Sequence, residues 1–293
     1  MTQATAGRLA TETSDSEIDD ETCLRLARVR AFPAEHRFLE RVREGCRVAQ
    51  PLPTAVAAPM SDVALRGAFE AAHAGLIVPI LVGPETELRE LAAQSAIELG
   101  GVEIVHASDD VEVARACADL CRSGRARLLM KGSIPSEVLL HEIVRTESGL
   151  RTSRRMSHVF ILDVPAYPRP LFITDAAVNI YPSLADKVDI VVNAIELARL
   201  LGVHTPNVAI LSAVETVHAK IQATLDAAAL SKMAERGQIQ GAIIDGPLAF
   251  DTAVSAEAAR IKHLNSAVAG AADILVVPDM ESGNMLVKQL EYL

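Results

Sequence analysis

From Thr54 onward, short aliphatic runs alternate with amphipathic segments, and this alternation constrains the fold more than any other feature of the chain. Such a pattern favours parallel sheets covered by helices on both faces. The runs predicted as strands are 55–58, 77–82, 102–106, 126–130, 158–163, 171–174, 208–211, 242–244 and 274–277. The segments predicted as helices are 62–74, 85–99, 111–122, 136–146, 184–201, 216–236 and 253–262, preceded by an amphipathic segment over 21–47 with a break at Pro33. We therefore expect an α/β fold with mostly parallel sheets.

The alternation is interrupted near residues 147–171, where two predicted strands follow each other with no helix between them. A loop-linked pair of this kind indicates a sheet boundary or an antiparallel excursion. A chain of 293 residues is long enough for two domains. We expect a disordered tail over residues 1–20, which are rich in Thr, Ser and acidic side chains, a first α/β domain over 21–148 and a second over 149–293.

Composition excludes several classes of protein. No apolar run reaches the roughly 18 residues that a membrane span needs, and the N-terminus lacks the basic and apolar regions of a secretory signal. A net charge of −10 argues against nucleic acid as a partner, although a local basic cluster would still allow a small anionic substrate. The four cysteines favour free thiols in a reducing compartment.

Polar residues follow several of the predicted strands. In open α/β sheets ligands bind beyond the carboxyl ends of the strands, so these positions are candidates for a site. They are Lys131, Asp175 with Asn179, Ser212, Asp245 and Asp279. A Ser, Asp or Asn at such a position can instead cap the next helix. The two interpretations are compatible, because a helix N-terminus also favours anions.

A basic cluster stands out against the acidic background. Arg145, Arg151, Arg154 and Arg155 lie close together in the sequence, just before Ser157. Arginine presents a planar fork that can hold phosphate oxygens in pairs. A solvated basic loop is the alternative interpretation.

The familiar catalytic signatures are missing. The chain has no G-x-x-x-x-G-K-[ST], no G-x-G-x-x-G after a strand and no G-x-S-x-G. Its histidines have no metal-ligand spacing. The sequence therefore gives no positive support to a metal site or to a serine nucleophile.

An ordered series of motifs resembles the phosphate acetyltransferase and phosphate butyryltransferase family over about residues 50–293. The motifs are "LLMKGSIPSEVLL", "RRMSHVFILDVP", "FITDAAVNIYPSLADKVDIVVNAIELARLLG", "NVAILSAVE", "AIIDGPLAFDTAVS" and "HLNSAVAGAADILVVPDMESGNMLVKQLEYL". The resemblance implies transfer of a short-chain acyl group between coenzyme A and inorganic phosphate. It also implies a two-domain fold similar to the isocitrate and isopropylmalate dehydrogenases, with an inter-domain cleft. Further implications are a cytoplasmic homodimer formed through the second domain, and no metal or redox cofactor, with coenzyme A as a substrate.

The reaction needs cations for the phosphate and donors toward the developing oxyanion. For the phosphate we expect Lys131, Arg154 and Arg155. For hydrogen bonds to the substrate we expect Ser157, Asn179 and Ser212. Asp175 is a further candidate for substrate binding, and Asp245, Asp251 and Asp279 are expected to orient the cleft or cap helices.

Members of the resembled family continue past the Gly-Asn helix into a segment with a Ser-Arg-x-Asp-like motif, to which the catalytic residues are assigned. The chain ends at Leu293 without this segment, so no residue inherits those roles. A truncated chain, a naturally inactive protein or a rebuilt active site would each explain this, and we expect impaired activity. The alternative functions are a non-catalytic acyl-CoA or phosphoester binding protein, a hydroxythreonine-phosphate dehydrogenase, and a phosphate acyltransferase acting on acyl carrier protein.

Overall fold

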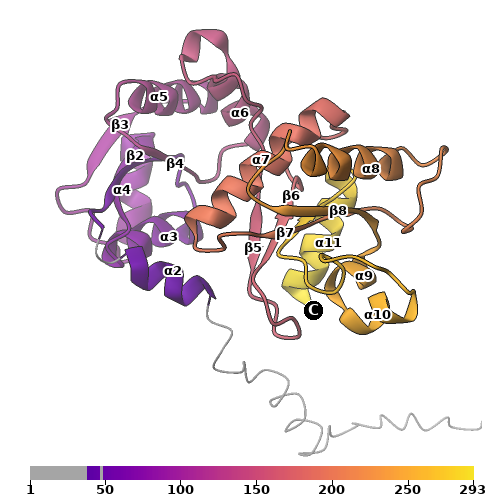
Figure 1. The fold of residues 1–293 in the computed structure, drawn as a ribbon. Coiled ribbons are helices and arrows are strands. Elements are labelled where there is room, and N and C mark those ends of the chain that lie inside the picture. The colour runs from indigo at the N-terminus through magenta and orange to yellow at the C-terminus, as the bar shows by residue number, and fades with distance from the viewer. Residues whose placement is uncertain (1–37, 47–48) are drawn as a thin grey trace, which may run out of the picture.

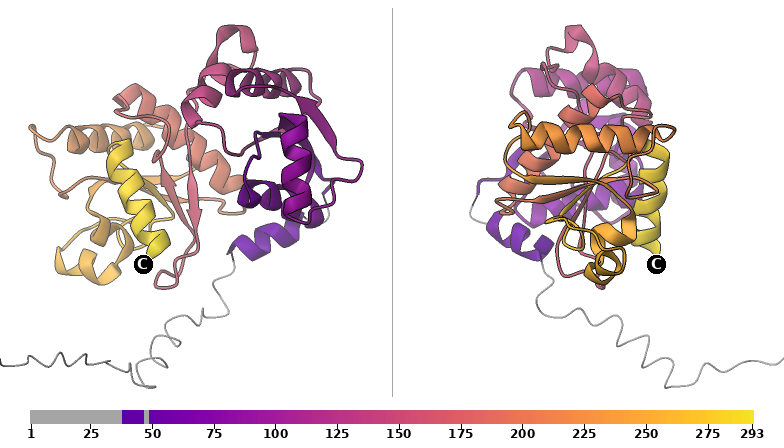
Figure 2. Two further views of the ribbon diagram at one scale, coloured as in Figure 1. Left: turned by 180° about the vertical axis from the view of Figure 1, so that it is seen from behind. Right: turned by 45° about the vertical axis from the view of Figure 1, so that its right-hand side comes forward.

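Two sheets organise the chain, of which the computed structural model describes residues 38–46 and 49–293. The ribbon shows two lobes side by side, each built on one sheet (Figure 1), and two further views show the same division (Figure 2). The first sheet has the order β3-β2-β1-β4 and is parallel throughout. Its strands are β1 (Leu52–Ala57), β2 (Ile77–Gly83), β3 (Glu103–His106) and β4 (Leu128–Lys131).

Helices cover both faces of the first sheet. They are α3 (Asp62–His73), α4 (Glu85–Gln94), α5 (Asp110–Arg122) and α6 (Ser136–Val144), followed by a short 3₁₀ helix over Thr146–Ser148. Alternate residues of a strand point to opposite faces. Val56 accordingly packs in the core beneath α3 and α4 with Leu65, whereas Ala55 packs on the other face with Val113 and Leu139 of α5 and α6.

The second sheet has the order β5-β6-β9-β7-β8. Its strands are β5 (Phe160–Leu162), β6 (Leu171–Thr174), β7 (Asn207–Leu211), β8 (Ile243–Leu248) and β9 (Ile274–Val276). All pairings are parallel except that of β5 with β6, which is antiparallel. The interruption near residues 147–171 is therefore an antiparallel edge strand.

Two layers of helices enclose this second sheet. One face is covered by α7 (Leu184–Leu200) and α8 (Gln222–Glu235). The opposite face is covered by α9 (Phe250–Val254) and α11 (Met280–Tyr292), and α10 (Ala256–Ile261) packs against α9. The strands of the first sheet all precede residue 149 in the sequence, and those of the second sheet all follow it. The division into domains at this residue stays a prediction. A role of the second lobe in dimerisation also stays a prediction.

Three helices differ from the expected bounds by more than a turn or are divided. The helix expected over 85–99 ends at Gln94, because Ala96 adopts a left-handed φ of 53° and the Ile97 N–H donates back to Ala92 O at 2.8 Å. The helix expected over 216–236 begins only at Gln222. The helix expected over 253–262 is divided at Ser255, which is extended and caps the second part.

Only α2 (Phe38–Cys46) of the amphipathic segment expected over 21–47 lies within the described residues. Its Phe38 packs edge-on against Phe172 of the second sheet, with ring centroids 5.8 Å apart. The expected tail over 1–20 lies outside the described residues. Cys46, Cys117 and Cys121 are free thiols, and burial raises the pKa of Cys117 to about 12.

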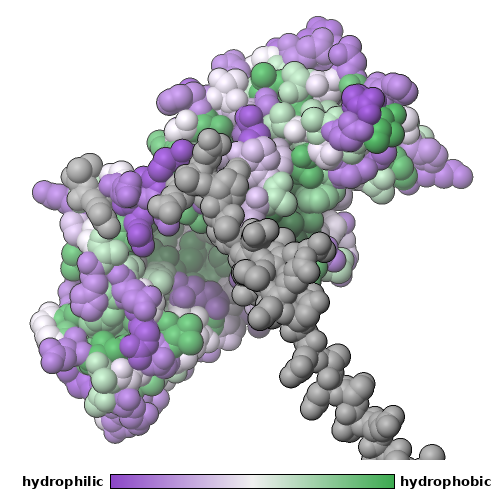
Figure 3. All heavy atoms as spheres, turned by 90° about the horizontal axis from the view of Figure 1, so that it is seen from below, coloured by the Kyte–Doolittle hydropathy of each residue, from purple (hydrophilic) through white to green (hydrophobic). Residues whose placement is uncertain are grey.

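The surface mixes polar and apolar side chains. Seen from below, hydrophobic residues form separate groups among hydrophilic ones (Figure 3). Of the helices in the described part of the chain, none is both long and apolar enough to cross a membrane.

Candidate functional site

A hollow of about 1280 Å³ lies between α6 of the first lobe and α7 of the second. One wall is the loop that connects the lobes, residues 150–157, which we call the arginine segment. The apolar residues of α6 that line the hollow are Leu140, Ile143 and Val144. Other lining side chains are Arg151, Arg154, Arg155, Ser157, Asn179, Asp189 and Asn193. Arginines that are clustered in the sequence therefore share one concave surface.

One face of α7 holds the arginine segment in place. Residues three or four apart on a helix lie on the same face, and this face carries Asp186, Asp189, Asn193 and Glu196. The backbone N–H of Arg155 donates to Asp189 Oδ2 at 2.9 Å. The Asn193 side-chain amide donates to Arg155 O at 2.9 Å and to Ser157 Oγ at 2.8 Å. The segment is thus bonded through both its main chain and its side chains.

The Arg155 side chain is held at two points and remains half exposed. Its Nε lies 2.6 Å from Asp186 Oδ1, and its Nη1 donates to Asn179 Oδ1 at 3.1 Å. Hydrogen bonds from Ser183, with a smaller contribution from the Arg155 charge, hold the pKa of Asp186 below its usual range. Asp186 is therefore a carboxylate that stays ionised beside Arg155.

Arg154 is engaged differently. Its Nη1 lies 2.5 Å from Glu196 Oε2 and 3.3 Å from Asn193 Oδ1, and this guanidinium lowers the pKa of Glu196. Arg151 forms neither a hydrogen bond nor an ion pair with any residue in the described ranges. Arg154 and Arg155 of the hollow thus each have two side-chain partners, whereas Arg151 has none among the described residues.

Asp175 supports the site from behind the hollow. The carboxylate follows β6 and is only 3 % exposed. Its Oδ1 accepts from Ala177 N and Val178 N, both at 3.0 Å. Its Oδ2 accepts from the Asn179 backbone at 3.2 Å and from Asn179 Nδ2 at 2.6 Å. Asp175 therefore does not line the hollow but fixes Asn179, which does.

Two predicted aspartates lie elsewhere. Asp279 caps α11, its Oδ1 accepting from Ser282 N at 2.9 Å. Asp245 Oδ1 accepts from the adjacent Gly246 N at 2.8 Å. Neither lines the hollow. Asp279 thus caps the helix after its strand, which is the alternative interpretation given above for polar residues at strand ends.

Lys131 and Ser212 are also outside the hollow. Lys131 is exposed at the end of β4, with Nζ 3.3 Å from Gly132 O. Ser212 follows β7 and is 8 % exposed, and its Oγ has no hydrogen-bond partner among the described residues. Of the predicted site residues, the hollow brings together Arg154, Arg155, Ser157 and Asn179.

His158 borders the site without lining it. Its Nδ1 is buried and has no hydrogen-bond partner in the described part of the chain. Burial lowers the pKa of this imidazole, and the Asp175 charge partly opposes the shift. The ring packs against Phe160 at a centroid distance of 4.4 Å. The surroundings favour a neutral histidine.

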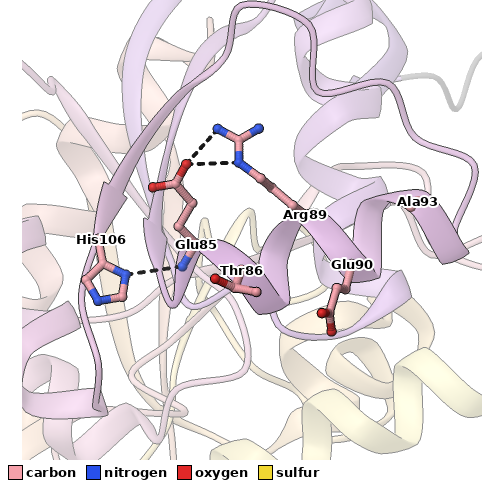
Figure 4. Close-up of a pocket in the computed structure, with 6 residues that line it drawn as sticks. All are labelled: Glu85, Thr86, Arg89, Glu90, Ala93 and His106. Carbon is pink, nitrogen blue, oxygen red and sulfur yellow. Dashed lines mark hydrogen bonds and ion pairs between the residues drawn. The ribbon is translucent and has the colours of Figure 1, made fainter.

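A second, smaller hollow of about 480 Å³ lies at the N-terminus of α4 (Figure 4). The Arg89 guanidinium pairs there with Glu85, its Nη2 2.7 Å from Oε1. The Glu85 backbone N–H donates to His106 Nδ1 at 3.3 Å. Glu90 adds a further carboxylate. The lone arginine of this hollow already has an acidic partner, which makes it a poorer anion site than the larger hollow.

Asp189, Asn193 and Glu196 were not among the residues predicted from the sequence. Their spacing with Asp186 is a detectable signal for one polar face on α7. The sequence pattern does not identify the segment that lies against this face. Within residues 38–46 and 49–293, no group of three or more His, Cys, Asp or Glu side chains is arranged to hold a metal ion.

The known proteins that resemble this chain share one type of name, phosphate acyltransferase or phosphotransacylase. The family model described as "Phosphate acetyl/butaryl transferase" matches residues 111–293. The phosphate acetyltransferase of Rhizobium meliloti is 53% identical over 262 residues, covering 89% of this chain and 83% of the relative. The phosphate butyryltransferase of Clostridium acetobutylicum is 40% identical over 238 residues, covering 81% and 79%. A solved branched-chain phosphotransacylase from Enterococcus faecalis matches with a TM-score of 0.70 and 31% identity, covering 82% and 84%.

These comparisons correct one expectation. The expected likeness to the isocitrate and isopropylmalate dehydrogenases is wrong, because the solved structures that match with TM-scores of 0.66 to 0.70 are phosphotransacylases. Another of them, from Streptococcus pyogenes, has a TM-score of 0.70 at 22% identity and supports the fold alone. Strand and helix alternation indicates parallel sheets but does not determine which α/β arrangement is adopted. By family model and by relatives over most of its length, the chain belongs to the phosphate acetyltransferase and phosphate butyryltransferase family.

Proposed function

We propose that this chain transfers a short-chain acyl group between coenzyme A and inorganic phosphate, and that it does so in the hollow between α6 and α7. The names of its relatives, which include acetyl, butyryl and branched-chain enzymes, support the reaction class. The observation that carries the placement is the arginine segment. It gathers three guanidinium groups in one concave surface of a chain whose net charge is −10.

The proposed chemistry uses these groups directly. A phosphate oxygen attacks the thioester carbonyl carbon of acyl-CoA, the new C–O bond forms, the C–S bond breaks, and coenzyme A leaves as a thiolate that takes up a proton. Arg155 and Arg154 offset the charge of the phosphate. The Ser157 oxygen already accepts a hydrogen bond from Asn193, which leaves its O–H free to donate to a substrate oxygen.

The apolar part of the lining suits an acyl chain. It consists of Leu140, Ile143 and Val144 on α6 and Leu197 on α7. Burying one methylene contributes about 0.8 kcal/mol. Acetyl, propionyl and butyryl groups should therefore differ in affinity by modest steps.

The proposal invokes no metal or redox cofactor, because the bond exchange needs charge stabilisation and no electron transfer. Prolonged dialysis against a chelator should accordingly leave the rate unchanged. We extend the proposal to a homodimer formed through the second lobe, which light scattering would detect, and to a cytoplasmic site of action. Both follow from the family resemblance.

Nothing in the comparisons supports the other functions considered, namely a non-catalytic binding protein, a hydroxythreonine-phosphate dehydrogenase and an acyltransferase acting on acyl carrier protein. Nor do they support impaired activity. The proposed function therefore includes neither these alternative functions nor impaired activity.

The test is an assay of acetyl-, propionyl- and butyryl-CoA with inorganic phosphate, following release of the free thiol. We expect turnover with at least one of them. Arg155→Ala should raise the KM for phosphate roughly ten- to a hundredfold, since a hydrogen bond to a charged group contributes about 1.5–3 kcal/mol. The matched control is Arg260→Ala on α10, whose guanidinium pairs with Glu257 outside the hollow. Absence of turnover with every acyl-CoA would refute the reaction, and equal KM values for the two variants would refute the site.

A further inference from the structure

We propose that Asp186 is a positioning residue: it holds the Arg155 guanidinium so that its remaining donors meet a phosphate group in the hollow. This inference deepens the proposed function and depends on the same site. Asp186 is not among the side chains that line the hollow, so any effect on the substrate must pass through Arg155.

Asp186 is fixed independently of Arg155. It occupies the third position of a capping box at the start of α7. Its Oδ2 accepts from Ser183 N at 3.0 Å and from Ser183 Oγ at 2.8 Å. Its own N–H donates back to Ser183 Oγ at 3.3 Å. One carboxylate oxygen therefore ties Asp186 to the helix end, and Oδ1 is left to pair with Arg155.

A second fixed group faces the other side of the guanidinium. Asn179 Nδ2 donates to Met156 O at 3.0 Å and to Asp175 Oδ2 at 2.6 Å. Because both acceptors require the N–H₂ end of the amide, Asn179 presents Oδ1 to Arg155 Nη1. The guanidinium is thus held between a carboxylate at Nε and an amide oxygen at Nη1.

These contacts leave the donors that a phosphate needs. No hydrogen bond joins Nη2 of Arg155 to another described residue. Both Nη2 protons and one Nη1 proton are therefore uncommitted, which suffices for paired contacts to two phosphate oxygens. A long side chain that is already immobilised loses less conformational freedom when the anion binds.

If Asp186 competed with phosphate for Arg155, its substitution would change phosphate affinity in the opposite direction. If Asp186 only neutralised Arg155 and competed with phosphate, Asp186→Asn would remove a negative charge and tighten phosphate binding. If Asp186 positions Arg155, the same substitution weakens binding, because the freed guanidinium must be ordered again by the ligand. The sign of the change separates the two roles.

The experiment measures inorganic phosphate binding by calorimetry and, separately, the KM for phosphate and kcat. We expect Asp186→Asn to weaken phosphate binding and raise KM about three- to tenfold, with a smaller change in kcat. In an Arg155→Ala background the same substitution should have no further effect. The charge-matched control is Glu235→Gln on α8, which removes an exposed pair with Lys232 and should change neither quantity.

Unchanged or tighter binding in Asp186→Asn would overturn the proposal, and so would an equal effect in the Arg155→Ala background. Asp186→Glu keeps the charge and the capping-box chemistry. If Asp186→Asn does not fold, Asp186→Glu replaces it in the test. A positioning role predicts that Asp186→Glu binds phosphate more weakly, and a competing role predicts unchanged phosphate binding. Phosphate binding that depends on Asp186 without any turnover would refute the proposed reaction but uphold the positioning role. A parent protein that binds no phosphate would refute both.

Discussion

Lys187 on α7 and Asp226 on α8 form an ion pair whose side chains are only 6% and 5% exposed. Lys187 Nζ lies 2.7 Å from Asp226 Oδ2, and Gln222 Nε2 donates to Asp226 Oδ1 at 2.8 Å. The pair joins two helices on the same face of the second sheet. Asp226→Asn tests it, because the new amide keeps the size of the side chain while removing its charge.

The expected cost follows from the burial of both groups. In Asp226→Asn the Lys187 ammonium stays buried without a counter-charge, which typically costs about 3–5 kcal/mol. At about 2–4 °C per kcal/mol, the melting temperature should fall by roughly 6–20 °C. Replacing both partners by apolar residues, in Lys187→Met with Asp226→Leu, should recover most of this loss because no charge remains buried.

Thermal unfolding followed by far-ultraviolet circular dichroism is the assay, since the chain has no Trp for fluorescence. The exposed pair Lys232 and Glu235 on α8 supplies the control, and Glu235→Gln should leave the melting temperature almost unchanged. The reasoning would be refuted if Asp226→Asn lowered the free energy of unfolding by less than about 1 kcal/mol. It would also be refuted if the double variant were less stable than Asp226→Asn.

The remaining predictions concern pH and two glycines. Burial lowers the pKa of His158, so its contribution to stability is present above the ordinary pKa of about 6.5 and is lost as the pH falls below it. His158→Gln should therefore show a smaller fall in melting temperature between pH 7.5 and 5.5 than the parent, and an equal fall would contradict this origin. Gly132→Ala would place a Cβ 2.5 Å from Ala58 O, against backbone, and should clearly lower the melting temperature. Gly67→Ala, inside α3 with nothing within 4 Å, should raise stability by about 0.5–1 kcal/mol, and the reverse order of the two variants would contradict the contact argument.

Local sequence was sufficient where one interaction type dominates. β6 is predicted at Leu171–Thr174 from a short aliphatic run, and all four residues are buried, as in a strand enclosed on both faces. The start of α7 at Leu184 follows from the Ser183 and Asp186 capping box. In contrast, the start of α8 depends on Thr224 Oγ1, which binds the His218 backbone, a contact that periodicity does not indicate.

Only part of the candidate site is predictable from the sequence, and the reason is physical. The rule that strand ends meet at one edge holds within a single sheet, and Lys131 ends a strand of the first sheet while Ser212 ends a strand of the second. Arg154, Arg155 and Ser157 lie near one another because they are close in sequence. The acidic residues on α7 that bond to Arg154 and Arg155 are Glu196 and Asp189, which come 42 and 34 positions later in the chain. No local pattern specifies that pairing.

The two walls of the hollow belong to different lobes. The guanidinium groups of Arg154 and Arg155 are bonded to α7 and Asn179 of the second lobe, whereas Leu140, Ile143 and Val144 belong to α6 of the first lobe. A change in the separation of the lobes would therefore alter the room for an acyl chain while the anion-binding donors keep their mutual geometry. If the proposed function holds, acyl-chain selection and phosphate binding in this hollow would depend on different lobes.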